Sequence, residues 1–260
     1  MLADDRLAHL DEHAPSLGPH GTLTALRHIT PVTNRQVAQR HLIAARAFRW
    51  LSDESSASLQ VTSALAAATL AGAGPLLAHV WLGRATLLGG EASARGVAAG
   101  PLVSNLCSAA ASRAGTDHAL HASALFRLSF ERAAARDPWG ARNALDEAQR
   151  WAARGDVDAA VVGAHTATTL WALGDYGEAE RCAAVGCGAQ PSLRIASLAD
   201  LARIGLATGD DDGACEYLLQ ADHEARALGR VDHLPRLRPL VLQLPQRLRK
   251  LATDHIGPGE

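Results

Sequence analysis

The sequence predicts an all-α fold, an α-solenoid of antiparallel helix pairs, from three observations. Alanine makes up about a fifth of the 260 residues, whereas there are only three Phe and two Tyr; helices favour Ala and Leu, and strands favour aromatic and β-branched side chains. Gly and Pro divide the chain into pieces of helical length. Within these pieces apolar residues recur every three or four positions, which is the spacing of one helix face.

The breaks between the expected helices lie at nine places. They fall at Gly72 to Pro75, Gly89-Gly90, Gly100-Pro101, Asp137-Pro138, Gly155-Asp156, Gly174-Asp175, Gln190-Pro191, Gly209-Asp210 and Gly229. Residues 117–135 show the helical period well, because Leu120, Ala124 and Leu128 share one stripe. Turns this short fold each helix back on its predecessor, so we expect a stack of antiparallel pairs.

Two of these breaks carry signals for the start of a helix. Asp137 can cap a helix with Pro138 at its first position, and Asp175 followed three residues later by Glu178 resembles a capping box. Such side chains accept hydrogen bonds from the main-chain N–H groups that have no partner at a helix N-terminus.

The segment from Leu170 to Pro191, LWALGDYGEAERCAAVGCGAQP, resembles the second half of a tetratricopeptide repeat, with Gly174, Tyr176, Ala179 and Pro191 at the family's positions. In that pattern the glycine allows the turn, the tyrosine fills the gap between paired helices, the alanine permits close approach and the proline ends the second helix.

A second copy of the repeat follows, in which Ala214 corresponds to Ala179 at a spacing of 214 minus 179, or 35 residues. A third and looser copy lies upstream, with Ala141, Leu145 and Ala148 at the second-helix positions. We therefore expect a tetratricopeptide-like repeat domain over residues 36–252, an N-terminal helical segment over residues 1–35 and a flexible tail over residues 253–260.

The repeats, together with the closing stretch ARALGRVDHLPRLRPLVLQL, resemble the C-terminal helical-repeat regions of actinobacterial helix-turn-helix regulators of the Xre type. In those proteins the repeat region is regarded as a sensing or protein-contact module, and a separate N-terminal domain reads DNA. Residues 1–35 are too short to supply that domain, so the resemblance implies a role in transcriptional or developmental regulation without direct DNA binding.

Charge and cysteine content indicate a cytoplasmic protein. The formal net charge is -2, so no overall field attracts nucleic acid or an anionic membrane. The cysteines form no C-x-x-C pair and lie in apolar helical stretches, as expected of buried, reduced thiols; they are Cys107, Cys182, Cys187 and Cys215. The chain contains no apolar run long enough to span a bilayer and no signal peptide, which again indicates the cytoplasm.

Several local motifs are better explained by ordinary helices than by function. Residues 36–51 partly match a helix-turn-helix, but Leu42 stands where the turn needs Gly, so we expect one continuous helix. His9, Glu12 and His13 spell H-x-x-E-H, a zinc motif, at a polar terminus where a surface helix is favoured. His118 and His121 have no acidic or thiol partner on their face. We expect no metal and no cofactor.

No glycine loop, nucleophile motif or paired acids indicate catalysis, so we expect a protein that is not an enzyme. The one strong charge asymmetry is a basic patch near the end of the chain, which is either a contact for phosphate or an acidic partner or a solvated face of the last helix. The residues of this patch are Arg236, Arg238, Arg247, Arg249 and Lys250.

The tetratricopeptide resemblance implies a groove lined by the first helix of each pair. The family's inward positions correspond to Phe126, Phe130, Thr168, Trp171 and Arg203. Exposed aromatic side chains in such a groove would bind a protein or peptide partner; packing in the core is the competing interpretation. A sensor with an enclosed pocket, a DNA-binding regulator and self-association through a terminal repeat remain open alternatives.

Overall fold

The computed structural model describes residues 3–256, apart from the side chains of Glu91, Ala94 and Pro235, and over this range its regular elements are all helices, joined by turns, with no strand. The helices are α1 (Ala3–Arg27), α2 (Asn34–Trp50), α3 (Glu54–Ala71), α4 (Gly74–Leu88), α5 (Gly90–Ala94), α6 (Pro101–Arg113), α7 (His118–Ala134), α8 (Pro138–Arg154), α9 (Ala159–Leu173), α10 (Tyr176–Gly186), α11 (Pro191–Thr208), α12 (Asp211–Ala227), α13 (Leu234–Val241) and α14 (Gln246–Ile256). The all-α prediction is confirmed.

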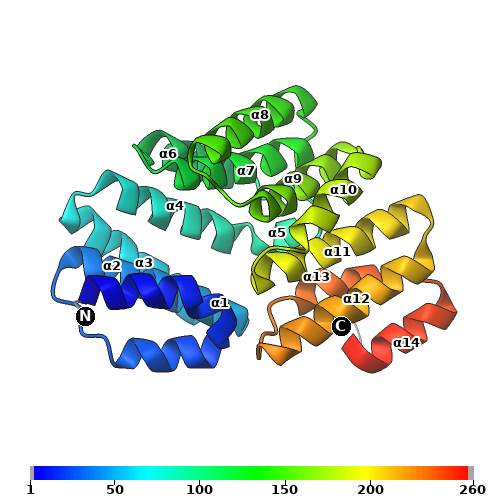
Figure 1. Cartoon of the computed structure of the whole chain (residues 1–260), viewed down its shortest axis with the longest axis horizontal. Helices are drawn as coiled ribbons and strands as arrows, with labels where there is room; N and C mark the ends of the chain where they lie inside the picture. Colours follow the sequence, from blue (N-terminus) through cyan, green and yellow to red (C-terminus); the bar gives the residue numbers. More distant parts are fainter. Residues whose placement is uncertain (1–2, 257–260) are drawn as a thin grey trace.

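The helices pack as adjacent pairs that follow one another along an arc (Figure 1). The pairs are α2 with α3, α4 with α6, α7 with α8, α9 with α10, α11 with α12, and α13 with α14. The first helices of neighbouring pairs also contact one another, from α2 through α4, α7, α9 and α11 to α13. This row of first helices forms the inner face of the arc, and the second helices form its outer layer.

The N-terminal end of the arc meets the turn that follows α12. The main-chain N–H of Val231 donates to the carbonyl of Trp50 at 2.9 Å, and the guanidinium of Arg230 lies 5.0 Å from the Trp50 ring centre. Gly18, where α1 is kinked, approaches the Leu228 carbonyl so closely that a Cβ at this position would lie 2.3 Å from its oxygen. Contacts that α1 and α2 make with the turn after α12 thus close the arc.

Every predicted break coincides with the end or start of a helix. The Asp137 cap is confirmed, since its carboxylate accepts from the Gly140 N–H at 2.9 Å. The Asp175 capping box is wrong, because that carboxylate instead accepts from Arg142 on α8 at 2.5 Å and makes no cap bond. Pro191 occupies the first turn of α11 and does not end α10, which stops at Gly186.

The predicted outer segments of the chain are part of the packed structure. Residues Leu7, Leu10 and Leu26 of α1 are buried against Ile43 of α2, so the N-terminal segment is packed onto the helix pairs. α14 continues to Ile256, which is buried, so residues 253–256 are helical and do not belong to a tail. The rest of the predicted tail, residues 257–260, lies outside the described residues.

Within the described residues, none of the helices combines the length and the apolar character needed to cross a membrane.

Candidate functional site

The predicted groove residues lie together on the inner face, on α7, α9 and α11. The Phe126 ring stacks on the His165 ring with centroids 5.4 Å apart, which joins α7 to α9. The Thr168 hydroxyl donates to Asp200 at 2.6 Å, and the Arg203 guanidinium lies 5.1 Å from the Trp171 ring centre, which joins α9 to α11. The predicted groove residues therefore lie on three neighbouring helices of one face.

This surface is covered rather than open. Phe126, Phe130 and Arg203 are buried, and only Thr168 and Trp171 keep partial exposure. The interpretation of the two phenylalanines as exposed groove aromatics is thus wrong, because both are among the buried residues of α7. Part of the covering comes from the chain itself, through the connection between α4 and α6.

We call this connection, residues 89–100, the connecting segment; it contains α5 and lies in the middle of the arc (Figure 1). Its main chain contacts three inner helices. The Gly89 carbonyl accepts from Arg127 Nη2 on α7 at 3.3 Å, and the Ala99 N–H donates to Glu131 Oε2 on the same helix at 2.7 Å.

The connecting segment also reaches α9 and α11. The Ser93 carbonyl accepts from Arg203 Nη2 on α11 at 3.5 Å. Gly96 packs directly on the Trp171 indole of α9, so that a Cβ at this position would lie 2.3 Å from Cη2 of the ring. The inner face therefore already holds a short stretch of polypeptide, mainly through main-chain groups and one aromatic ring.

Two buried carboxylates organise the charges of this face. Glu131 is 1% exposed and accepts from Arg127 at 2.6 Å. Asp200 is fully buried and pairs with Arg203 at 3.2 Å and with Arg236 of α13. The pKa of Arg203 is lowered to about 10, chiefly by burial and also by the nearby Arg236, while Asp200 opposes the shift. Each carboxylate thus holds in place an arginine that donates to the connecting segment.

Some polar atoms at this contact have no partner within the described residues. They include the hydroxyl of Ser93 in the connecting segment, Nε of Arg127 and Nε of Arg236, all of them buried. A buried polar atom without a hydrogen bond costs about 1–3 kcal/mol. The connecting segment therefore leaves some buried polar atoms at the inner face without hydrogen bonds.

His165 is a neutral group within this charged neighbourhood. Burial lowers its pKa to about 4; Asp200 opposes this shift and Arg127 adds to it. Its imidazole is therefore uncharged at neutral pH, which suits its stacking on Phe126. No sequence motif singled it out.

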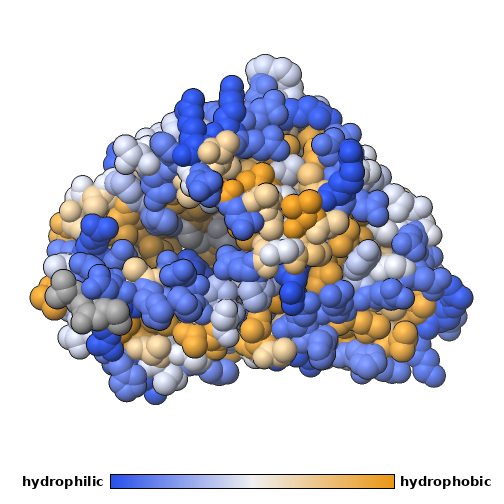
Figure 2. Space-filling view, in the orientation of Figure 1, coloured by the Kyte–Doolittle hydropathy of each residue, from blue (hydrophilic) through white to orange (hydrophobic). Residues whose placement is uncertain are grey.

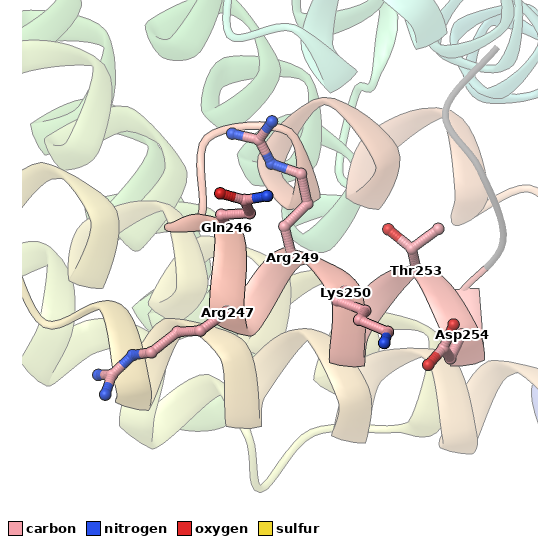
Figure 3. Close-up of a pocket in the computed structure, with 6 residues that line it drawn as sticks. All are labelled: Gln246, Arg247, Arg249, Lys250, Thr253 and Asp254. Carbon is pink, nitrogen blue, oxygen red and sulfur yellow. The ribbon is translucent and has the colours of Figure 1, made fainter.

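The predicted basic patch is not one surface. Arg236 points inward to Asp200, and Arg247 pairs with Asp212 of α12 at 3.1 Å. Arg249 donates to the Leu244 carbonyl at 3.0 Å. Figure 3 shows that Arg247, Arg249 and Lys250 leave α14 in different directions around a shallow, open hollow. These residues do not converge on a single anion.

The other motifs behave as surface or core helices. α2 runs without a break from Asn34 to Trp50, with Leu51 as its C-cap, and Thr33 caps its start together with Gln36, so the prediction of one continuous helix here is confirmed. His9, Glu12 and His13 are exposed on α1, with one ligand atom from each within 4.8 Å of the others, a spacing that could hold a cation. His121 stacks on Trp151 at 4.2 Å.

The surface of the molecule offers open hollows. One is the α14 hollow described above, and another lies along α8 between Asn143 and Ala153; both are shallow. In Figure 2, apolar side chains appear near the middle of the visible face and also at its left edge and along its lower part, among hydrophilic ones.

The cysteines are free thiols, as predicted, but they are not all buried. Cys107 and Cys215 are buried, whereas Cys182 and Cys187 are partly exposed. Burial raises the pKa of the Cys107 thiol to about 12 and also raises the pKa values of the other three. Raised values disfavour the reactive thiolate, so these groups are poor nucleophiles.

Comparison with protein-family models and with curated proteins found no match.

The sequence identified Thr168, Trp171 and Arg203, but it missed the groups that organise them. The pairs Arg127–Glu131 and Asp200–Arg203 are local, at i,i+4 and i,i+3. The bonds that tie these groups to the connecting segment, to Thr168 and to Arg236 join residues 32 or more positions apart, so no local motif marks them. One signal was present: Gly89-Gly90 and Gly100-Pro101 enclose a stretch too long for a turn and rich in Gly and Ala. Such a composition suits a segment that must approach other side chains closely.

Proposed function

We propose that this is a non-catalytic helical-repeat protein that binds a peptide or protein partner on its inner face, in transcriptional or developmental regulation. The observation that carries the proposal is the connecting segment, whose main chain is held by Arg127, Glu131 and Arg203 and packs on Trp171. A surface that binds main-chain groups of one segment has the chemistry to bind another.

The regulatory part of the proposal rests on the resemblance of the repeats to those of Xre-type regulators. The binding part rests on the inner face alone. Arginines anchored by buried carboxylates lose little freedom when they donate to a ligand, and a tryptophan offers a large contact area. These are the features of residues that dominate binding energy at protein interfaces.

The test is a selection of displayed random peptides on the immobilised protein, followed by calorimetry with the recovered peptides. Trp171→Ala removes the aromatic platform of the inner face. Trp139→Ala is a matched control, because Trp139 is 78% exposed at the start of α8, in the outer layer. Loss of a central tryptophan costs about 2 kcal/mol or more, which is about 30-fold in Kd.

We expect recovered peptides to lose this affinity with Trp171→Ala and to keep it with Trp139→Ala, with both variants equally helical by circular dichroism. Equal losses, or a loss confined to Trp139→Ala, would place binding outside the inner face and refute the proposal.

A further inference from the structure

We propose that the connecting segment is an internal occupant of the inner face, and that a partner binds by displacing it with a segment of the same chemistry. This inference rests on the proposed function and specifies how the inner face is regulated and what it recognises. The occupied state is the one the structure shows.

The chemistry of the contact defines the ligand. Arg127 and Arg203 each donate to a main-chain carbonyl, and Glu131 accepts from a main-chain N–H. The ligand is therefore a stretch of polypeptide that supplies acceptor oxygens to the two arginines and an amide proton to the carboxylate. A carboxylate in place of either carbonyl would bind an arginine more strongly, because such hydrogen bonds are charge-assisted.

Trp171 selects glycine at one position of that stretch. Gly96 has φ +71, a left-handed conformation that other residues rarely adopt, and a Cβ there would lie 2.3 Å from the indole. Any side chain would push the segment off the ring. A displacing partner therefore carries a glycine that can take the place of Gly96.

The connecting segment is suited to displacement because its contact with the inner face leaves buried polar atoms without hydrogen bonds. The Ser93 hydroxyl and Arg127 Nε are buried without a hydrogen bond within the described residues. Val97, next to the glycine, is 50% exposed, and Ala98 and Ala99 are only partly buried, Ala99 against the core. A ligand that provides partners for these polar atoms gains free energy that the connecting segment does not supply.

The experiment weakens the contact of the connecting segment with the inner face and adds the same segment as a separate peptide. In Gly96→Ala the new Cβ collides with Trp171. Gly174→Ala is the matched control, since Gly174 also has positive φ, +83, and has no atom within 4 Å of its Cβ position. The probe is a fluorescein-labelled synthetic peptide of residues 88–101 with Gly96 intact, and its binding is followed by fluorescence anisotropy.

While the connecting segment occupies the inner face, the peptide can bind only the fraction of molecules in which the segment has left it. A variant whose inner face is always open therefore binds the peptide with an apparent affinity higher by the inverse of that fraction. We expect the peptide to bind Gly96→Ala at least about tenfold more tightly than it binds wild type or Gly174→Ala. A peptide carrying the Gly96→Ala change should not bind, and adding Trp171→Ala to the protein should abolish binding. Equal affinity for all three proteins overturns the proposal.

Hydrogen exchange on the unaltered protein gives a second test that needs no variant to fold. The Ala99 N–H, which donates to Glu131, should exchange through a local opening that is insensitive to low denaturant, whereas amides in α7 exchange through global unfolding. If the Ala99 amide exchanges only with global unfolding, the segment is a fixed part of the core and the proposal fails.

The two proposals fail separately. Selected peptides that bind wild type and Gly96→Ala equally would leave the inner face as a binding surface and overturn its internal regulation. Exchange of the segment without any selected peptide would support the internal occupant and count against an outside partner.

Discussion

Acidification should destabilise the fold through His165. Burial holds the pKa of this imidazole at about 4, below the ordinary 6.5. Between these values the unfolded chain binds a proton that the folded protein does not, so stability falls as the pH drops below about 6.5, and the loss is complete near pH 4. For these two pKa values, the loss from pH 7.5 to pH 5.0 is about 2 kcal/mol.

The chain has 12 histidines, so the contribution of His165 must be isolated by difference. We would measure the free energy of unfolding in urea for wild type and His165→Gln at both pH values. Between pH 7.5 and pH 5.0, wild type should lose about 2 kcal/mol more than the variant. Equal losses in the two proteins would show that His165 takes up its proton in the folded state, and would refute the assignment of a buried, neutral imidazole.

Two further predictions concern helix packing and capping. Gly186→Ala should destabilise the protein by about 1–3 kcal/mol, because a Cβ there would lie 2.4 Å from the Ser197 hydroxyl. In the same helix, a Cβ at Gly177 would meet no atom within 4 Å, so Gly177→Ala should be neutral or stabilising by up to about 1 kcal/mol. The urea midpoint of Gly186→Ala should therefore be the lower of the two, and the reverse order would contradict the prediction. Asp137→Ala should cost about 1 kcal/mol through loss of the α8 cap; calorimetric melting measures it, and an unchanged midpoint would show that water replaces the carboxylate.

The sequence was most informative where local rules decide the structure. Glycine and proline end helices through their own backbone restrictions, so each predicted break was found at a helix boundary. Ala179 and Ala214 are fully buried, as the close approach of paired helices requires. The Asp175 cap failed because a distant arginine, Arg142, competes for the carboxylate.

The candidate site could be predicted only in part, for the same physical reason. The repeat pattern places Thr168, Trp171 and Arg203 on one face, because helical spacing is local information. The occupant of that face comes from residues 89–100, and its bond from Ser93 to Arg203 spans 110 positions of sequence. No periodicity within a helix encodes such a contact, so an open groove was expected where the chain folds back on itself.

The hydrogen bond between Val231 and Trp50 has a consequence for how the molecule unfolds. In an open array each repeat touches only its neighbours, and terminal repeats can fray one at a time. Here α1 and α2 contact the turn after α12, so the N-terminal helices cannot loosen without breaking these contacts, whereas among the described helices α14 contacts only α12 and α13. The closing contact joins residues far apart in sequence, which raises the contact order and favours slower folding. The helices from α1 to α12 therefore form a closed ring and not an open arc.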